Sequence, residues 1–336
     1  MRAVHSAAGR VLGTLGVAAT AALLAATTAA AAQPTVIRVA GISRYDTSAQ
    51  ISARSYAPHP SVAFIASGDT FPDALAAGPA AAKRQGPVLL VRQDAITQSV
   101  QLELHRVHPD NIILLGGTNT VSERVGQKLL DTNYTNGTVT RIAGVDRYDT
   151  AAQVSAATFA PGVSVAYVAS GADFADALSG AAAAGAAGGP MLLVRPDSVP
   201  ATTAAELTRL KPTSIVLLGG TSSVSGAVQT ALGAYSQTVV RRSGADRYAT
   251  SAAVSAAAFP GGAPTAYVAS GETFPDALSA SAPAAITPGP VLLVRAACMP
   301  VSISQEIDRL KSTTLVVVGG TATVSDAAAN RALCPS

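Results

Sequence analysis

The sequence predicts an α/β protein of three tandem modules, each a small parallel sheet flanked by helices. A nine-residue segment occurs three times, as SGDTFPDAL at 67–75, SGADFADAL at 170–178 and SGETFPDAL at 270–278. The spacing inside each copy is constant, since 24 residues separate Arg44 from Gly68 and the same interval recurs in both later copies. Runs of β-branched residues alternate with alanine-rich stretches, which is typical of strands and helices that follow one another in a parallel sheet.

Each module opens with a short strand (36–41, 139–144 or 239–244), followed by an Arg-Tyr pair and a helix. A threonine shortly after the pair is expected to help start that helix. These threonines are Thr47, Thr150 and Thr250. The copies differ in length only in the connector near 131–138, which indicates separate folded units. The predicted boundaries are 33–137, 138–237 and 238–336.

The second strand of each module runs into the nine-residue segment. Ser and Gly end the strand, Phe fills the turn, and an alanine-rich helix follows. An aspartate then lies near the positive end of that helix, at the sheet edge where open parallel sheets usually bind ligands. These aspartates are Asp73, Asp176 and Asp276. The alternative is that each segment is only a capped, well-packed turn.

The third strand follows a Gly-Pro pair as VLLVR or MLLVR, a continuous apolar run suited to burial on both faces. The next helix carries a glutamate and an arginine three residues apart, expected to form ion pairs on the surface or between modules. The fourth strand ends in Gly-Gly-Thr, and a last helix begins near Ser122, Ser225 or Ser325.

The first 32 residues have the pattern of a secretory signal peptide. Arg2 and Arg10 precede or flank an apolar stretch that ends in small residues at 30–32. Their removal changes the balance of 23 basic and 20 acidic residues from +3 to +1. So small a net charge gives no field to attract nucleic acid, and any anionic partner must be held by local arginines. No later segment is predicted to span a membrane.

Four ordered motifs resemble one known family. They are the DRYDT-type opening, the SGETFPDAL turn, the GPVLLVR strand and the VLLGGTSSVS ending, each present in three versions. Together they resemble the bacterial cell wall-binding repeat 2 modules of clostridial-type cell wall proteins, over essentially all of 36–336. The resemblance implies a pseudo-threefold packing of three modules that holds a surface protein non-covalently on anionic cell-wall polymers. Ser43 and Ala175 depart from the other copies, so the three modules are expected to bind unequally.

The arginines are the candidate contacts for an anionic polymer. One set follows the third strand, at the sheet edge that presents ligands. A second set belongs to the Arg-Tyr pairs, where the guanidinium clamps a phosphate or carboxylate and the ring stacks on a sugar. The alternative for this second set is that each arginine caps carbonyls in a tight turn. The candidate ligand-binding residues are Arg92, Arg195, Arg295, Arg44, Tyr45, Arg147, Tyr148, Arg247, Tyr248, Asp73, Asp176 and Asp276.

Catalytic, metal and cofactor sites have little support in the sequence. After removal of the signal, the histidines all lie in the first module, so the repeats share no triad or zinc site. The Gly-Gly-Thr turns lack the lysine of a P-loop, and the serines lack the GxSxG pattern. We therefore expect no cofactor and no bound metal.

The two cysteines, Cys298 and Cys334, both lie in the third module of a chain predicted to be exported. A disulfide is the leading interpretation, and two free thiols are the alternative. The whole sequence thus predicts a secreted, non-catalytic protein of the cell wall or cell surface that binds an anionic polysaccharide or teichoic-type polymer. The competing functions are a cell-wall hydrolase of the N-acetylmuramoyl-L-alanine amidase type and an adhesin or wall-assembly protein.

Overall fold

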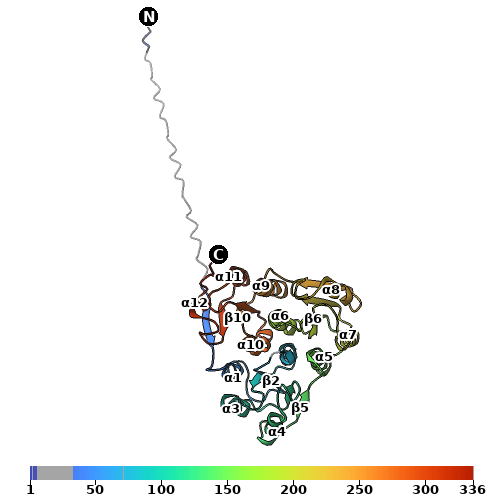
Figure 1. The fold of residues 1–336 in the computed structure, drawn as a ribbon. Coiled ribbons are helices and arrows are strands. Elements are labelled where there is room, and N and C mark those ends of the chain that lie inside the picture. The colour runs from blue at the N-terminus through green and yellow to red at the C-terminus, as the bar shows by residue number, and fades with distance from the viewer. Residues whose placement is uncertain (2, 6–32, 71, 336) are drawn as a thin grey trace. The chain divides into compact units, whose positions relative to one another are not determined.

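Three four-stranded parallel sheets form the framework of the chain in the computed structural model, which describes residues 1, 3–5, 33–70 and 72–335. Helices flank each sheet, so the predicted α/β class is confirmed (Figure 1). The predicted signal peptide, 1–32, lies almost wholly outside the described residues. From Pro34 onward the described chain forms one compact unit, which is the subject of all that follows.

The strand order is the same in every sheet. The first sheet is β3-β2-β4-β5, the second β7-β6-β8-β9 and the third β11-β10-β12-β1, and every pair is parallel. The strands are β1 (Thr35–Val39), β2 (Ala63–Ser67), β3 (Val88–Val91), β4 (Ile112–Leu115), β5 (Val139–Ile142), β6 (Val165–Ser170), β7 (Met191–Val194), β8 (Ser214–Leu218), β9 (Thr238–Arg242), β10 (Thr265–Ser270), β11 (Val291–Val294) and β12 (Thr314–Val318).

Each sheet takes one strand from the next module. The opening strand β5 pairs with β4 of the first module, in the register Ile112 to Val139, and β9 pairs with β8 in the same way. The first strand of the chain, β1, pairs with the last, β12, in the register Thr35 to Thr314. The sheets therefore cross the predicted module boundaries at 138 and 238, and β1 closes the three modules into a ring.

An arginine in each exchanged strand anchors it to the preceding module. Arg38 donates to the carbonyl oxygens of Gly319 and Val324 at 2.8 and 2.9 Å. Arg141 and Arg241 donate in the same way to carbonyls of the Gly-Gly-Thr turns that follow β4 and β8. These carbonyl groups lie at partly buried positions, where an unpaired acceptor would be costly.

Four kinds of helix flank the sheets. The opening helices are α1 (Arg44–Ser55), α5 (Arg147–Thr158) and α9 (Arg247–Ala258). The alanine-rich helices are α2 (Ala77–Lys83), preceded by the short 3-10 helix η1 (Pro72–Ala74), α6 (Ala175–Ala186) and α10 (Pro275–Ile286). The helices after the third strands are α3 (Gln98–Val107), α7 (Ala201–Leu210) and α11 (Val301–Leu310). The last are α4 (Glu123–Asp131), α8 (Gly226–Leu232) and α12 (Asp326–Ala329).

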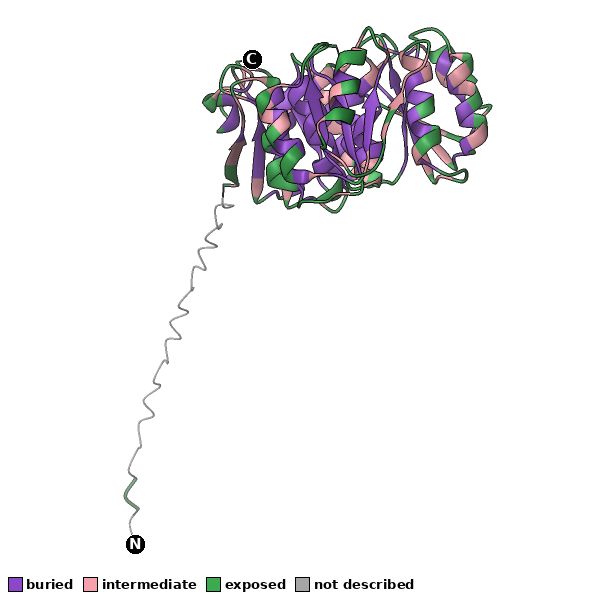
Figure 2. Cartoon of the chain, turned by 90° about the horizontal axis from the view of Figure 1, so that it is seen from below, coloured by how far each residue is buried: buried purple, intermediate pink, exposed green. Residues whose placement is uncertain are grey.

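The alanine-rich helices pack against one another at the centre of the three modules, where α6 and α10 are seen in Figure 1. Small side chains permit this approach. A Cβ atom on Gly78 of α2 would lie 2.2 Å from Oγ of Ser281 in α10 and 3.3 Å from Ala181 in α6. The alanine content of the sequence is thus explained by a crowded pseudo-threefold centre, with the buried strands around it (Figure 2).

The opening helices begin differently from the prediction. Ser43, Asp146 and Asp246 are the N-caps, and their side chains accept backbone N–H groups of the first turn. The threonines expected to start these helices instead accept the backbone N–H of a loop glycine, such as Gly41 by Thr47. Serine and aspartate are comparable N-caps, so the departure at Ser43 preserves this function.

The glutamate and arginine pairs were expected on the surface or between modules, and this was wrong. The glutamates are buried, with side chains 5% exposed, and each forms two hydrogen bonds with an arginine of its own helix. The same arginine donates to a carbonyl at the end of the opening helix, for example that of Phe159. The pair therefore joins two helices within one module. The pairs are Glu103 with Arg106, Glu206 with Arg209 and Glu306 with Arg309.

Among the described residues, no helix has the length and apolar character needed to cross a bilayer.

Candidate functional site

The nine-residue segments form tight turns at the carboxyl ends of β2, β6 and β10. Oγ of Ser67 accepts the backbone N–H of Asp69 at 3.1 Å, and Ser170 and Ser270 do the same two residues on. The following glycine is required because the tyrosine of the opening helix lies against it. A Cβ on Gly68 would lie 2.6 Å from Cε1 of Tyr45. The turn and the Arg-Tyr pair, 24 residues apart in sequence, are therefore one structural feature.

The arginines that end the third strands lie over these tyrosines. The guanidinium carbon of Arg92 is 5.1 Å from the ring centre of Tyr45. The equivalent distances are 5.2 Å for Arg195 over Tyr148 and 5.1 Å for Arg295 over Tyr248. All three arginines are exposed. Each module thus presents one cation on an aromatic face at the edge of its sheet.

The tyrosines are held in place beneath the arginines. The hydroxyl of Tyr45 donates to Asp69 at 2.5 Å. Burial, followed by that hydrogen bond and the charge of Asp69, raises the pKa of Tyr45 to about 12, so the phenol is neutral at physiological pH. Burial also raises the pKa of Tyr248. Tyr45 is therefore a fixed and neutral aromatic surface beneath Arg92.

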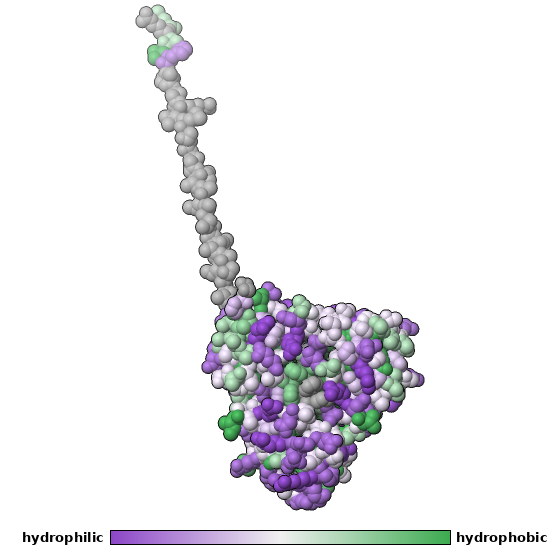
Figure 3. All heavy atoms as spheres, in the orientation of Figure 1, coloured by the Kyte–Doolittle hydropathy of each residue, from purple (hydrophilic) through white to green (hydrophobic). Residues whose placement is uncertain are grey.

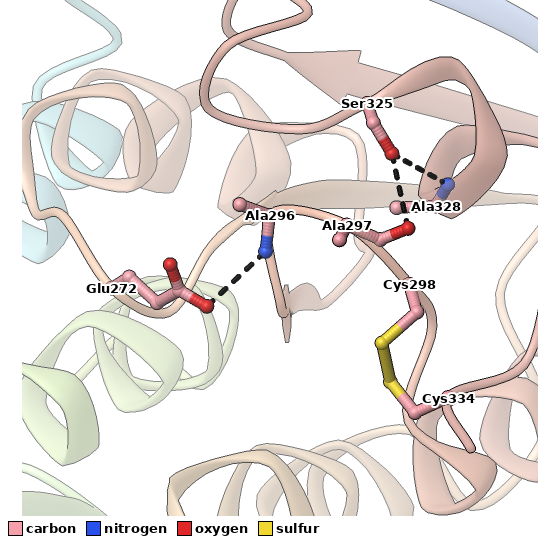
Figure 4. Close-up of a disulfide and its surroundings, with 7 residues drawn as sticks. All are labelled: Glu272, Ala296, Ala297, Cys298, Ser325, Ala328 and Cys334. Carbon is pink, nitrogen blue, oxygen red and sulfur yellow. Dashed lines mark hydrogen bonds between the residues drawn. A yellow bond between two sulfur atoms is a disulfide. The ribbon is translucent and has the colours of Figure 1, made fainter.

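The acid beneath the strand end differs between modules. Asp69 accepts the backbone N–H of Gln93, and Glu272 accepts that of Ala296 (Figure 4). The second module has Ala172 at this position, and there Arg195 lies 3.7 Å from Asp146 instead. The three exposed arginines therefore have unequal acidic surroundings.

The arginines of the Arg-Tyr pairs cap carbonyls in the adjacent turn. Arg44 donates to the carbonyl oxygen of Gly68 at 2.6 Å, Arg147 to Gly171 at 2.6 Å and Arg247 to Gly271 at 2.7 Å. Part of each guanidinium is thus used inside its own module, which is the alternative that the sequence left open.

The same arginines lie between modules, opposite the aspartates of the preceding nine-residue segment. Arg44 and Asp276 line one cavity of about 200 Å³ between the first and third modules. The charge of Arg247 likewise acts on Asp176, and Arg247 also lies 3.5 Å from Asp173. The helix α5, which Arg147 opens, packs against η1, which contains Asp73. The structure therefore combines Arg-Tyr and aspartate motifs from neighbouring modules.

The three aspartates differ in burial and partners. Asp73 accepts a hydrogen bond from Thr120 at 3.0 Å. Burial raises the pKa of Asp176, and the nearby Asp173 adds to the effect. Asp276 is only 6% exposed, and no described residue forms a hydrogen bond with its Oδ1. Burial raises its pKa to about 6, against smaller opposing effects of Thr323 and Arg44.

Exposed aliphatic residues rim these interfaces and were not anticipated from the sequence. Ile42 and Val145 are almost fully exposed at equivalent positions before the opening helices. In the sequence, the one sign of these residues is that an apolar side chain stands between the loop glycine and the N-cap residue of the opening helix. On the face seen in Figure 3, hydrophobic residues are scattered among hydrophilic ones.

The cysteines are joined in the structure, with sulfurs 2.07 Å apart and Cα atoms 4.9 Å apart (Figure 4). The disulfide lies in the loop that follows Arg295. Backbone hydrogen bonds join the same two segments. The N–H of Met299 donates to the carbonyl of Ala332, and the N–H of Cys334 donates to the carbonyl of Met299. The C-terminal segment is therefore bonded to the loop carrying one candidate arginine.

Among the described residues, no three His, Cys, Asp or Glu side chains cluster in a way suited to a metal ion.

Comparison with known proteins identifies the family. The model of the cell wall binding domain 2 (CWB2) family matches residues 38–126, 141–229 and 241–329, which is most of the chain in three copies. The chain belongs to this family. The first residue of each match is one of the arginines that anchor the exchanged strands, so the CWB2 repeats start within those strands.

Two solved CWB2-like structures share the fold. Cwp6 from Clostridium difficile superposes with a TM-score of 0.81 at 26% identity, covering 91% of this chain and 50% of Cwp6. Cwp8 from the same organism gives 0.79 at 25% identity, covering 89% of this chain and 51% of Cwp8. The repeats and these cell wall proteins point to the cell surface and to binding of cell-wall polymers.

Two curated relatives come from Bacillus subtilis (strain 168). The N-acetylmuramoyl-L-alanine amidase LytC is 29% identical over 302 residues, which are 90% of this chain and 59% of LytC. The amidase enhancer is 30% identical over 211 residues, which are 63% of this chain and 28% of that protein. The chain thus spans only part of each relative.

Proposed function

We propose that this protein attaches non-covalently, and without catalysis, to an anionic cell-wall polysaccharide or teichoic-type polymer through its three CWB2 repeats. The observation that carries the proposal is the set of exposed arginines, each over a tyrosine ring at the edge of a sheet. An exposed guanidinium forms charge-assisted hydrogen bonds with phosphate or carboxylate. The tyrosine ring below it restricts the side chain before binding, so less conformational entropy is lost when the polymer binds.

The pseudo-threefold arrangement supports binding to a repeating polymer. The three sheets share one strand order, so each module carries its exposed arginine at the equivalent strand end. A polymer with regularly spaced acidic groups meets equivalent cations there, and each further contact becomes intramolecular.

The proposal includes export, with cleavage near Ala32. The expected result is an N-terminal mass that begins close to Gln33.

Co-sedimentation with isolated bacterial walls tests the proposed function. We expect the purified protein to sediment with intact walls and to remain in solution after acid extraction of their anionic polymers. Retention that survives extraction contradicts an anionic partner. Release of soluble wall fragments during incubation, free peptides included, contradicts a non-catalytic role and favours the hydrolase suggested by the amidase relative.

A further inference from the structure

The cavity between the first and third modules holds the most unusual carboxyl group among the described residues. Asp276 is buried and lines the cavity, and its enclosed Oδ1 has no hydrogen-bond partner in the part of the chain that the structure describes. A buried acceptor without a partner is costly, and such groups usually have a binding or catalytic reason. Oδ2 meets the hydroxyl of Thr323 only at 3.5 Å. Oδ1 itself is enclosed, so a ligand that donates hydrogen bonds must meet the carboxyl group at Oδ2.

The other walls of the cavity restrict the ligand further. Arg44 lines the same cavity, and its charge acts on Asp276. Its one side-chain hydrogen bond among the described residues goes to the Gly68 carbonyl. Cation and carboxylate oppose each other, so the cavity is close to neutral and disfavours a ligand of net charge. Ile42, fully exposed at the rim, offers an apolar surface. The volume of about 200 Å³ lies below the range of about 300–1,000 Å³ typical of drug-sized ligands.

From these features we infer that the cavity binds a single uncharged sugar unit of the wall polymer, whose hydroxyl groups donate to Asp276 and accept from Arg44. The C–H face of the ring lies toward Ile42. This inference rests on the proposed function, because it assigns the neutral part of the polymer to the cavity and its acidic groups to Arg92, Arg195 and Arg295.

The equivalent interfaces are less suited to a sugar. Between the second and third modules, Asp173 pairs with Arg247 at 3.5 Å, whereas the first-to-third interface has Thr273 in place of that acid. Between the first and second modules, Asp73 already accepts a hydrogen bond at 3.0 Å from Thr120. The sequence departures between copies thus make one interface different from the other two.

Saturation-transfer NMR with uncharged methyl glycosides of glucose, galactose, N-acetylglucosamine and N-acetylmannosamine tests the inference on the full chain. We expect transfer to at least one of these probes. Ala322→Phe, which fills the cavity from an exposed turn position, should weaken binding at least about tenfold, the loss expected for hydrogen bonds to a charged group. The matched control Ser222→Phe changes the equivalent turn of the second module and should bind like the unaltered protein.

A second variant covers failure of Ala322→Phe to fold. Asp276→Asn keeps the shape and removes the charge. Because ionised Asp276 is the stronger acceptor, binding by the unaltered protein should rise as pH increases through about 6, and the variant should lose that rise. Arg44 is the charged group that acts on Asp276, and Thr323 supplies its hydrogen bond.

The outcomes separate this inference from the proposed function. No transfer to any uncharged probe, or equal transfer in Ala322→Phe, overturns the cavity assignment. If walls still retain the unaltered protein in that case, the proposed attachment stands. If walls do not retain it, the proposed attachment fails irrespective of the NMR result.

Discussion

Arginine occupies four repeated positions in each module. Exposure separates the roles of the three that do not pair with the buried glutamates. The side chain of Arg38, in an exchanged strand, is 24% exposed. It donates hydrogen bonds to two carbonyls and forms an ion pair with Asp326. Arg247 of an Arg-Tyr pair is 36% exposed and donates to Gly271. Arg195 at a strand end is 53% exposed over its tyrosine. Exposure therefore favours the strand-end arginines as the contacts for a polymer.

The pH dependence of stability tests the environment of Asp276. An unfolded aspartate has a pKa of about 3.9, and burial raises that of Asp276 to about 6 in the folded protein. The folded state therefore binds the extra proton between these values, and stability is lost as pH rises through about 6. Asp276→Asn should raise the free energy of unfolding at pH 7.5 by up to about 3 kcal/mol and change it little at pH 4.

Urea unfolding of both proteins at the two pH values measures this difference. Asp69→Asn is not a suitable control, because Asp69 holds Tyr45. Asp94→Asn changes an exposed carboxylate and should leave the pH dependence as it is. An identical pH dependence in the Asp276→Asn protein would contradict a raised pKa.

The exchanged strands are the element whose placement the sequence did not predict. Each opening run has the β-branched residues of a strand, but that pattern is satisfied equally by the sheet of its own module or of its neighbour. The repeats, the α/β order and the turns depend on local patterns and were predicted from them. The placement of Asp276 and Arg44 in one cavity depends on how modules close in space, and so does the choice of sheet. The periodicity of the sequence within one module contains no information about either of these features.

Arg38→Ala should loosen closure of the ring. The change leaves the Gly319 and Val324 carbonyls without their donor, at a cost of about 1–3 kcal/mol. Hydrogen exchange should become faster in β1 and β12, while β6 and β7 keep their protection. Arg54→Ala, an exposed change in the last turn of α1, is the control. Unchanged exchange in β1 would show that backbone pairing alone holds the ring closed.

The disulfide should stabilise the third module through its C-terminal segment. Closing a loop between cysteines 36 residues apart is worth about 4 kcal/mol in the chain-entropy model. Reduction should therefore lower the melting temperature, and the Cys298→Ser, Cys334→Ser protein should melt low with or without reductant. Non-reducing peptide mapping should find the two cysteine peptides joined. Complete alkylation of both thiols before reduction would contradict the bond.

At the scale of the whole molecule, symmetry matters more than net charge. The charge of about +1 without the signal peptide gives little long-range attraction to a polyanion. Retention must then depend on short-range contacts repeated on one body. The crowded centre of alanine-rich helices fixes the modules relative to one another, so the distance between equivalent arginines is set before the polymer binds. A preorganised spacing reduces the entropy lost on binding.

Single and triple substitutions measure how retention is distributed among the modules. One arginine contact contributes about 1.5–3 kcal/mol, and three contacts on a rigid body multiply affinity because the later ones are intramolecular. Arg92→Ala, Arg195→Ala or Arg295→Ala alone should weaken wall retention modestly, whereas the triple change should nearly abolish it. The triple change Arg54→Ala, Lys83→Ala, Lys128→Ala removes the same charge from the last turns of three helices, away from the strand ends, and should retain binding. Circular dichroism must show that both triple variants fold. Full retention by a folded Arg92, Arg195, Arg295 variant would exclude these side chains, and Arg44, Arg147 and Arg247 would then be the set to substitute.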